Sequence, residues 1–502
     1  MKRRIENNKR VMLIYPPGTV YGEGLLTSNI PVGLLYLTAY LKKKGVTVKF
    51  LDALGTDSKR MVKNGKGRRF GMSIKKIFDE ISKFKPDMVG IGTMFTAYFD
   101  DSLEIARLVK KVDKNIKVVL GGSHVSIDPV SVVKNKWVDV AVYGEGEETL
   151  WELVKGVDLK NIQGIVFKEN KKIVKNDARE LVKNLDDLPF PAWEELDLPK
   201  YGLGGSFNMR TPVFPLVSSR GCPGHCLYCS VNSVWQHKWR GRSAENVVDE
   251  MEMLINKYGA REFAFQDDSM SVDKVRLEKI CNEIIRRKIN IKWTTPNGIA
   301  HWTLTKDLLL LMKKSGCYRI TFGIESGDRE LRRWVGKPYS LDQAKELTKY
   351  ANKIGYWTLA TNIIGFPYEN RENIDNTFKF ALKSDVDLAF FFRLGPRPGT
   401  PIYEMFAKEG WLMKDKHMLF SEDVACQTKY FSGEEIIAMQ KKLYKNFLIK
   451  RWMSPMSIFR ILNKIKSWED FDYILKISWA GYKLTKNLLT TRVGVTSRAL
   501  RA

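Results

Sequence analysis

Cysteine and histidine are scarce in this chain of 502 residues, which contains six cysteines and five histidines. A disulfide scaffold needs a short secreted chain dense in cysteine, so that class of protein is excluded. Long apolar runs are also missing, because the longest one near the N-terminus, residues 32–41, is about half the length of a membrane-spanning helix. The basic N-terminus leads into a short strand-like run and does not resemble a signal peptide. We therefore expect a cytoplasmic protein without a transmembrane segment.

Negative charge is in deficit as well. The 83 Lys or Arg residues against 57 Asp or Glu give a formal net charge of +26 at pH 7. This charge permits nucleic acid, an anionic membrane surface or an acidic substrate as a partner, and a solvated lysine-rich surface would also explain it. Apolar residues make up 44 % of the chain, so disorder is excluded, and the length predicts two or three globular domains.

The first domain, residues 8–158, is predicted to be a doubly wound, Rossmann-like α/β domain. Short apolar strands alternate with amphipathic helices, a pattern typical of βαβ units and a parallel sheet. The expected strands are residues 11–15, 46–51, 88–92 and 117–120, and the expected helices are residues 32–44, 73–84 and 101–112.

Glycine-rich segments follow the strands of this domain. They are Gly92-Thr93, Gly121-Gly122-Ser123-His124 and Gly144-Glu145-Gly146-Glu147. Ligands of doubly wound sheets bind outside the carboxyl ends of the strands, where glycine lets a backbone come close. Glycine is also needed simply to turn the chain, so the pattern alone leaves ligand binding and plain turn formation both open.

The rest of the chain divides into three parts. Residues 159–210 are predicted to be a proline-rich linker with a hairpin at 165–174. Residues 211–432 carry six strand–helix units, which predict a closed or partial (β/α)6 barrel of the TIM type with its active site at the carboxyl ends of the strands. Residues 433–502 are predicted to form a basic helical domain. The expected barrel strands are residues 216–219, 262–266, 291–295, 319–323, 358–364 and 388–392.

Three cysteines follow the first barrel strand, in the segment Cys222-Pro-Gly-His-Cys226-Leu-Tyr-Cys229. Thiolate ligands so close together favour an iron–sulfur cluster or zinc. An ordinary cluster needs a fourth cysteine, and zinc would need His225 or His237 to complete its four ligands. The other cysteines stand singly and are interpreted as small core residues: Cys281, Cys317 and Cys426.

The CxxxCxxC spacing, with an aromatic residue before the last cysteine, resembles the signature of the radical S-adenosylmethionine (SAM) superfamily. The resemblance implies a [4Fe–4S] cluster held by Cys222, Cys226 and Cys229, with a fourth iron left open for SAM. An electron passed into SAM would cleave it to methionine and a 5′-deoxyadenosyl radical, which abstracts a hydrogen atom. The resemblance also implies an external electron donor of the flavodoxin or ferredoxin type.

Segments at later strand ends resemble the SAM-binding elements of this family. They are Phe265-Gln-Asp267-Asp268, Gly323-Ile-Glu325-Ser326-Gly327 and Ile364-Gly365-Phe366-Pro367. Two positions depart from the family pattern, since Met270 replaces a phenylalanine and Tyr368-Glu369-Asn370 replaces Gly-Glu-Thr. The resemblance implies that SAM is bound by Tyr228, Asp267, Asp268, Glu325, Ser326 and Gly365.

A parallel α/β domain ahead of such a barrel resembles the cobalamin (B12)-binding radical SAM enzymes, a subclass similar to the class B methyltransferases. The resemblance covers about residues 10–410. The chain lacks the Asp-x-His-x-x-Gly motif by which other cobalamin domains supply a histidine to cobalt. His124 is therefore interpreted as a residue of the pocket wall or the core. The cobalamin contacts implied by the resemblance are Gly92, Thr93, Gly121, Gly122, His124, Gly144, Glu145, Gly146 and Glu147.

The main reaction of this subclass is methyl transfer from methylcobalamin to an unactivated carbon, or to a phosphinate phosphorus, of a small-molecule or lipid substrate. The cofactors carry the difficult chemistry, while the protein positions the substrate and excludes water. Ring closure or rearrangement without net methylation is the alternative. Strand-end position alone nominates the substrate-facing residues Asn297, Asn362 and Arg393.

Two further hypotheses are disfavoured. An RNA-modifying enzyme of the methylthiotransferase type would carry three more cluster cysteines in its first domain, and this chain has no cysteine before Cys222. Nucleic acid is therefore not expected as a partner. A protein that merely holds cobalamin would not need an intact cysteine loop.

The C-terminal region is strongly basic. Residues 436–502 carry fourteen Lys or Arg and three acidic residues, with Trp452, Trp468 and Trp479 on a helical apolar pattern. Such a segment is typical of peripheral contact with the inner face of a membrane. A helical cap packed on the barrel fits the pattern equally well, so both interpretations stay open.

Overall fold

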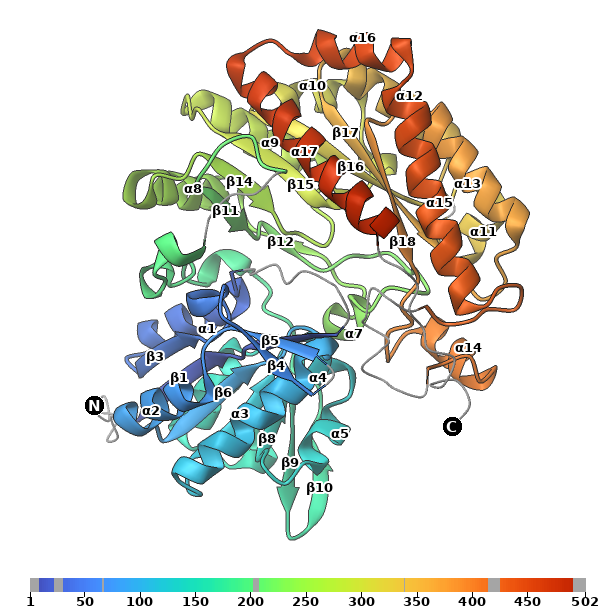
Figure 1. Cartoon of the computed structure of the whole chain (residues 1–502). Helices are drawn as coiled ribbons and strands as arrows, with labels where there is room; N and C mark the ends of the chain where they lie inside the picture. The colour runs from blue at the N-terminus through green and yellow to red at the C-terminus, as the bar shows by residue number, and fades with distance from the viewer. Residues whose placement is uncertain are drawn as a thin grey trace.

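The computed structural model describes residues 9–21, 30–65, 67–201, 207–337, 339–413 and 425–490. Figure 1 shows an N-terminal α/β domain, coloured blue to teal, below a larger α/β body coloured green to red. The predicted α/β class and the order of the parts along the chain are confirmed.

A seven-stranded sheet forms the centre of the N-terminal domain. In spatial order its strands are β10 (Lys172–Lys175), β9 (Ile165–Glu169), β8 (Val140–Val142), β7 (Lys117–Gly121), β6 (Met88–Gly92), β1 (Arg10–Tyr15) and β3 (Thr47–Asp52). The strands from β3 to β8 are parallel, and β9 and β10 add an antiparallel hairpin beside β8. The predicted hairpin therefore extends the first sheet as far as Lys175.

Helices cover both faces of this sheet, and β1 is buried along Val11 to Tyr15 because neither of its faces meets solvent. The second helix starts at a capping residue: the hydroxyl of Ser73 accepts a hydrogen bond from the N–H of Lys76. The helices are α1 (Val32–Lys43), α2 (Ile74–Phe84), α3 (Phe99–Val112), α4 (Ser123–Ile127), α5 (Pro129–Lys134) and α6 (Glu147–Lys155).

A small antiparallel sheet, which the sequence pattern did not predict, lies against α3. Its strands are β2 (Gly18–Tyr21), β5 (Gly67–Phe70) and β4 (Met61–Asn64). The buried Asp101 accepts hydrogen bonds from the N–H of Thr19 (2.7 Å) and from Nε of Arg69 (3.0 Å). This carboxylate fixes the small sheet to α3.

Six parallel strands form the second sheet, in the same order as in the chain. They are β11 (Val213–Leu216), β14 (Glu262–Phe265), β15 (Lys292–Ile299), β16 (Cys317–Glu325), β17 (Trp357–Ile364) and β18 (Leu388–Arg393). Because β11 and β18 are the two edges of the sheet, the barrel is partial, as predicted. The covering helices are α8 (Ala244–Tyr258), α9 (Lys274–Arg286), α10 (Lys306–Lys314), α11 (Arg329–Trp334), α12 (Leu341–Lys353), α13 (Arg371–Lys383) and α14 (Pro401–Lys408).

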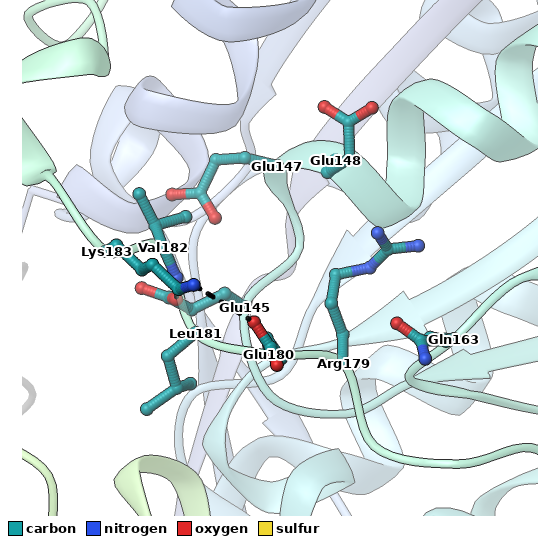
Figure 2. A pocket seen from close by; sticks show the side chains of 9 residues that line it. All are labelled: Glu145, Glu147, Glu148, Gln163, Arg179, Glu180, Leu181, Val182 and Lys183. Carbon is teal, nitrogen blue, oxygen red and sulfur yellow. Dashed lines mark hydrogen bonds and ion pairs between the residues drawn. The ribbon is translucent and has the colours of Figure 1, made fainter.

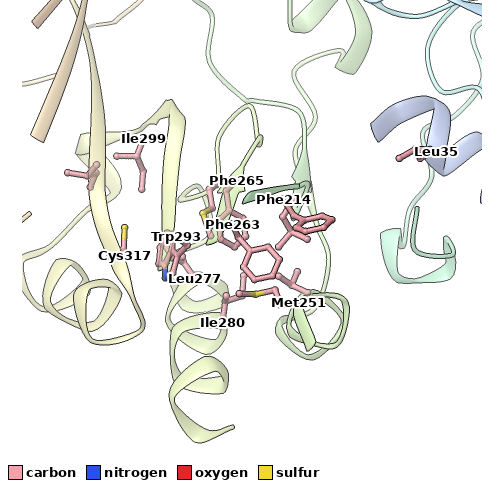
Figure 3. Packing of buried hydrophobic residues seen from close by; sticks show 14 of the residues in the cluster. Leu35, Phe214, Met251, Phe263, Phe265, Leu277, Ile280, Trp293, Ile299 and Cys317 are labelled. Carbon is pink, nitrogen blue, oxygen red and sulfur yellow. The ribbon is translucent and has the colours of Figure 1, made fainter. Parts of the chain in front are cut away.

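The barrel core is built from aromatic strand residues packed on helices. Figure 3 shows Phe263, Phe265 and Trp293 from the strands beside Met251 of α8 and Leu277 of α9. Cys281 and Cys317 are fully buried and Cys426 is 5 % exposed, which confirms their interpretation as core residues.

The C-terminal helices α15 (Gly433–Trp452), α16 (Pro455–Lys464) and α17 (Trp468–Thr490) pack on the barrel. Tyr473 and Ile477 of α17 bury against Tyr318 and Trp357 at the starts of β16 and β17. Helix α16 and the start of α17 therefore cap the end of the barrel opposite the carboxyl ends of the strands, while α15 runs along the edge strand β18. No helix among the described residues is long and apolar enough to cross a membrane.

Candidate functional site: a cysteine loop facing a glycine-lined sheet edge

A two-stranded ribbon closes the base of the cysteine loop. β12 (Ser219–Arg220) pairs antiparallel with β13 (Arg240–Gly241), so residues 221–239 form a loop that follows β11. Gly221 has a φ of +92°, and a Cβ atom at this position would lie 2.0 Å from the carbonyl oxygen of Lys238. Glycine is therefore required for the loop to close.

Two carboxylates at the end of β14 anchor the start of this loop. Asp267 accepts hydrogen bonds from the N–H of Ser218 (2.7 Å) and the hydroxyl of Ser219 (2.8 Å), and Asp268 accepts one from the N–H of Gly221 (3.1 Å). Burial raises the pKa of both carboxyl groups. The sequence pattern predicts these residues as SAM ligands. In the structure, their hydrogen bonds hold the start of the cysteine loop.

The three thiols of the loop lie close to one another. A Cβ atom added to Gly224 would lie 3.4 Å from Sγ of Cys222 and 3.8 Å from Sγ of Cys226. Burial first, and then the other two thiols, raise the pKa of Cys229 to about 11. Such thiols stay protonated at neutral pH until a metal centre displaces their protons. Three soft donors in one loop fit a [4Fe–4S] cluster with one iron left open.

The two histidines that a zinc site would need do not join the thiols. His225 and His237 stack on each other with ring centroids 4.1 Å apart, and Nδ1 of His237 lies 3.1 Å from the carbonyl oxygen of Gly224. The donor arrangement therefore favours a cluster over zinc.

A glutamate with a left-handed backbone stands beside the thiols. Glu325, the last residue of β16, has a φ of +63°, which is uncommon for a residue with a side chain and is typical of functional sites. Its Oε1 accepts a hydrogen bond from Nζ of Lys337 at 2.7 Å, and both side chains are buried. Burial and then the charge of Glu325 raise the pKa of Tyr228 well above its usual value. Of the six nominated SAM residues, Tyr228, Asp268 and Glu325 lie near enough to the thiols to shift the pKa of one or more of them.

Ser326 and Gly365, the last two nominated SAM residues, form hydrogen bonds within their own loops. The hydroxyl of Ser326, which is fully buried, accepts a hydrogen bond from the N–H of Asp328 at 3.1 Å. The N–H of Gly365 donates to Oε2 of Glu369 at 2.6 Å. Burial raises the pKa of Glu369 to about 8, so this carboxyl is mostly protonated at neutral pH.

Three buried residues around Glu325 escaped the sequence analysis. The guanidinium of Arg332 donates from Nε to the carbonyl oxygen of Lys337 (3.3 Å), while its two terminal nitrogens have no hydrogen-bond partner. Burial, then Arg332 and Lys337, lower the pKa of His301 to about 3, so its ring is neutral. No motif marks Lys337, Arg332 or His301, because each comes from a loop or short helix whose place is decided by the fold.

The nominated substrate-facing residues lie on three strands. Asn297 is exposed in the part of β15 where its register with β16 shifts. Asn362 on β17 is fully buried, donates from Nδ2 to the carbonyl oxygen of Phe390 (3.1 Å) and leaves its Oδ1 without a partner. Arg393 ends the neighbouring strand β18. The structure thus brings Asn362 and Arg393 onto adjacent strands and separates Asn297 from them by β16.

Glycines line the carboxyl edge of the first sheet. Gly92 and Gly121 are register partners at the ends of β6 and β7, and the N–H of the buried Thr93 donates to the carbonyl oxygen of Gly121 at 2.7 Å. A Cβ atom at Gly122 would lie 2.6 Å from the carbonyl oxygen of Thr93, whereas nothing lies within 4 Å of one at Gly144. This edge has close-packed backbone with open space beside it, as a flat ligand such as a corrin requires.

His124 borders this edge at the start of α4. Its Nδ1 lies 3.1 Å from the hydroxyl of Thr96, its ring centroid is 4.3 Å from that of Phe99, and its buried Nε2 has no partner. Burial lowers the pKa of His124 to about 4, so the ring is neutral at pH 7. A neutral ring with an unpaired nitrogen fits the interpretation of a pocket-wall residue.

The carboxylates of Glu145 and Glu147, also nominated as cobalamin contacts, pair with an arginine at the base of the cysteine loop. Arg220 donates to Oε1 of Glu145 (2.6 Å) and to Oε1 of Glu147 (2.8 Å). Figure 2 shows both glutamates on the wall of a pocket of about 390 Å³ that the linker residues enclose. Its lining residues are Glu145, Glu147, Glu148, Gln163, Arg179, Glu180, Leu181, Val182 and Lys183.

The glycine edge and the cysteine loop meet across the domain boundary. Helix α4 contacts α7 (Asn232–Trp235), the helix that follows the third cysteine. A Cβ atom at Gly399 would lie 2.8 Å from Cγ2 of Ile127 and 3.5 Å from Oγ of Ser233, so three segments come together at this point. The two candidate cofactor sites are therefore neighbours.

Two family models match the chain. The model of the radical SAM superfamily matches residues 216–381, and the model of the B12 binding domain matches residues 19–154. The first range contains the cysteine loop and the second contains the glycine-lined edge as far as Glu147.

Several proteins resemble the chain over most of its length. An uncharacterized methyltransferase of Pyrococcus horikoshii is 32 % identical over 90 % of this chain and 95 % of its own. The cytidylyl-2-hydroxyethylphosphonate methyltransferase of Streptomyces wedmorensis is 28 % identical over 88 % and 90 %. The anaerobic magnesium-protoporphyrin IX monomethyl ester cyclase of Rubrivivax gelatinosus is 28 % identical over 79 % and 69 %.

The fold also matches a solved structure. The cobalamin-dependent SAM radical enzyme OxsB, with aqua-cobalamin and SAM bound, superposes with a TM-score of 0.68 at 16 % identity over 94 % of this chain and 72 % of its own. At this identity the likeness establishes the shared fold.

Proposed function

The chain belongs to the radical SAM superfamily and carries a B12 binding domain, and from this premise we propose that it transfers a methyl group to an unactivated carbon or a phosphinate phosphorus of a small-molecule substrate. Its cofactors are a [4Fe–4S] cluster, SAM and cobalamin. When bound, the cluster supplies the electron that cleaves SAM, and cobalamin carries the methyl group.

One observation carries this proposal: α7, the helix that follows the third cysteine of the loop, packs against α4, the helix that follows the glycine-lined edge of the B12 binding domain. Radical formation and methyl delivery must act on the same substrate, so their sites must be neighbours. A cluster domain and a cobalamin domain far apart could not share a substrate.

The residues around the thiols are suited to hold SAM. Cys222, Cys226 and Cys229 would ligate the cluster, and Glu325 with Tyr228 would receive the amino group of the methionine part. The unpaired terminal nitrogens of the buried Arg332 suit the carboxylate, because buried N–H donors need acceptors. Asp267, Asp268, Ser326 and Gly365 would act indirectly, through the loops that they fix.

The residues of the first sheet would hold cobalamin from one side. Gly92, Gly121, Gly122 and Gly144 would let the corrin approach the backbone, with Thr93 and Gly146 shaping the turns between them. The neutral His124 would line the pocket. Asn297, Asn362 and Arg393 would face the substrate between the two cofactors, where the unpaired Oδ1 of Asn362 is a ready acceptor.

An external protein would supply the electron. Among the described cysteines, those outside the loop are buried core residues, which leaves the three loop cysteines for a cluster. The net charge of +26 favours a small acidic redox protein of the flavodoxin or ferredoxin type as the donor.

A peripheral membrane contact is a second part of the proposal. Helices α16 and α17 expose a row of large apolar side chains, among them Met456 (74 %), Phe459 (63 %) and Trp468 (84 %). Trp and Phe beside lysines are suited to the interface of an anionic membrane. Because this face lies at the capped end of the barrel, a membrane contact there would leave the cysteine loop directed away from the lipid, which favours a soluble small-molecule substrate.

Vesicle binding tests the membrane contact. We expect the protein to co-sediment with vesicles that contain phosphatidylglycerol, and the double variant Phe459→Ser/Trp468→Ser to stay in the supernatant. Met61→Ser, at an exposed apolar residue of β4, is the matched control and should sediment like the unaltered chain. Equal sedimentation of all three proteins, or none at all, would refute the contact. Point substitutions are required here because removal of residues 436–502 would uncover the barrel.

The central proposal is tested by cofactor content and by the fate of a labelled methyl group. The protein, purified without oxygen and supplied with cobalamin, should hold one cluster and about one corrin per chain. Cys226→Ala should lose its iron, whereas Cys281→Ala, at a buried core cysteine, should keep it. With SAM that carries a deuterated methyl group and a reductant, the label should appear in the bound corrin. Cleavage of SAM without label in the corrin would instead support ring closure or rearrangement, and absence of corrin would refute methyl transfer.

A further inference from the structure

A buried cluster of four charged side chains joins the two domains at the base of the cysteine loop. Glu145 and Glu147 come from the turn before α6 and the start of that helix, and Arg220 and Arg240 come from the two strands of the ribbon. The side chains of the two glutamates are 3 % and 6 % exposed, and those of the two arginines are 10 % and 11 % exposed. The four side chains thus carry equal numbers of positive and negative charges in a site with little water.

Arg220 is the bridging member. Its two terminal nitrogens donate to two different carboxylates, Glu145 and Glu147, and its guanidinium lies 5.2 Å from the ring centroid of Tyr36 on α1. A planar guanidinium held by two carboxylates and an aromatic face has a fixed orientation. Since Arg220 is two residues before Cys222, this orientation fixes the first end of the loop.

Arg240 holds the other end of the loop to the same carboxylate. Its Nη1 donates to Oε2 of Glu145 (2.9 Å) and to the carbonyl oxygen of Val182 (2.6 Å). The N–H of Val182 donates to Oε2 of Glu145 at 2.6 Å, so the linker is part of the same network. Both strands of the ribbon are therefore attached to the B12 binding domain through Glu145.

We infer that Glu145 and Glu147 are positioning residues that fix the distance between the cysteine loop and the corrin-binding edge, and that neither binds cobalamin directly. The inference rests on the proposed function, because it concerns the spacing of the two cofactors. Both glutamates follow Gly144, whose open side faces the space beside the sheet, while their own carboxylates point to the ribbon. The segment from Gly144 to Glu147 thus borders the cobalamin site and also holds the cysteine loop.

Loss of Glu145 would leave Arg240 without a carboxylate partner and loss of Arg220 would leave Glu147 without a cation, whereas loss of Glu147 leaves Arg220 held by Glu145 alone. A buried charge without a partner is far more costly than a broken exposed pair. Displacements of about 1 Å between reacting groups are enough to slow a reaction strongly. Weaker contacts among the four charged side chains should therefore disturb the spacing of the cofactors before they disturb cofactor binding.

The test measures the spacing of the two cofactors in the holoenzyme. Pulsed EPR on protein with the reduced cluster and cob(II)alamin reports the interaction between the two paramagnetic centres. For Glu147→Gln and for Arg220→Lys we expect unchanged iron and corrin content, together with a distance distribution that is broader or shifted by about 1 Å. Glu152→Gln is the matched control, since Glu152 pairs with Arg179 in the same domain without touching the ribbon.

The outcomes separate the possible failures. Loss of corrin from Glu147→Gln with the iron retained would overturn the inference and make Glu147 a cobalamin contact. An unchanged distance distribution in both variants would overturn it as well. If Glu147→Gln fails to fold, Arg220→Lys, which keeps the charge and loses the two-carboxylate geometry, decides the matter alone. Absence of corrin or cluster from the unaltered protein would instead refute the proposed function.

Discussion

Buried ion pairs hold both ends of the barrel, but the pairs at the two ends connect different parts of the molecule. At the carboxyl ends of the strands, Arg220 and Arg240 reach across to glutamates of another domain. At the opposite end, Lys464 and Arg460 of the tail reach Asp387, which precedes β18. The first group ties together two cofactor-binding segments, and the second attaches a covering helix to the barrel.

The buried polar atoms around these two groups of ion pairs can also be compared. Beside the cysteine loop, the terminal nitrogens of Arg332 and Oδ1 of Asn362 lack partners. At the capped end, Nε of Arg451 and both Nε and Nη2 of Arg460 lack hydrogen-bond partners too. Unpaired buried atoms therefore occur at both ends of the barrel, but only those beside the cysteine loop adjoin a candidate cofactor site, where a ligand could satisfy them.

The largest expected effect would come from the capped end. Asp387→Asn removes the anion that Lys464 contacts and leaves this lysine buried without a charged partner. We expect the free energy of unfolding to fall by about 3–5 kcal/mol. Urea denaturation measures the loss, and the EPR spectrum of the cluster should not change.

Lys464→Met sharpens this result. The methionine keeps the apolar stem over the ring of Trp357, and Asp387 retains the N–H of Thr358 as a donor at 2.7 Å. The loss should therefore be smaller than for Asp387→Asn. An equal or larger loss would show that Lys464, and not the aspartate, is the essential partner.

A pH dependence is expected at the catalytic end. The pKa of Glu369 is about 8 in the folded chain against 4.5 for an ordinary glutamate, so the folded state keeps a proton that the unfolded chain releases. The stability linked to this group is complete below about pH 4.5 and is lost as the pH rises toward 8. Glu369→Gln should therefore be more stable than the unaltered chain at pH 8.5 by roughly 2–4 kcal/mol, and the gain should shrink to below about 1 kcal/mol at pH 5.

Thermal unfolding at the two pH values measures this difference. Glu372→Gln, on the exposed side of α13, is the control and should behave alike at both. A gain from Glu369→Gln that is independent of pH would contradict a protonated Glu369.

The smallest expected effect concerns SAM itself. Glu325→Gln keeps the shape of the side chain and removes the charge that Lys337 contacts at 2.7 Å. We expect the affinity of the cluster-loaded protein for SAM to fall about tenfold, or roughly 1.4 kcal/mol. Equilibrium dialysis measures it, with the exposed Glu330→Gln as control. Unchanged affinity would remove Glu325 from the SAM site.

Local patterns in the sequence predicted much of this architecture. The six barrel strands and the cysteine loop are encoded in short segments whose hydrophobicity and spacing suffice to identify them. The small sheet of β2, β5 and β4 escaped because β5 reads Gly-Arg-Arg-Phe, with too few apolar residues for a strand pattern. Its strands exist because Asp101 binds Arg69 and Thr19 across the fold.

Partners distant in sequence could not be predicted. Arg220 and Glu145 are 75 positions apart and belong to different domains. A glutamate after a strand-end glycine has the same sequence pattern whether it meets a cofactor or a neighbouring arginine. The fold decides between these outcomes, and the same is true of Lys337, whose place beside Glu325 depends on the close approach of Gly336 to the loop.

The last helix of the chain has a consequence for synthesis on the ribosome. Glu469 at the start of α17 accepts two hydrogen bonds from Arg210, at 2.8 and 3.0 Å, just before the first barrel strand. Chains emerge N-terminus first, so the B12 binding domain is complete long before this contact can form. The contact between α17 and the barrel, in contrast, can form only after α17 has been made. Cobalamin can therefore meet a finished domain earlier in translation than the iron–sulfur cluster can meet a barrel covered by α17.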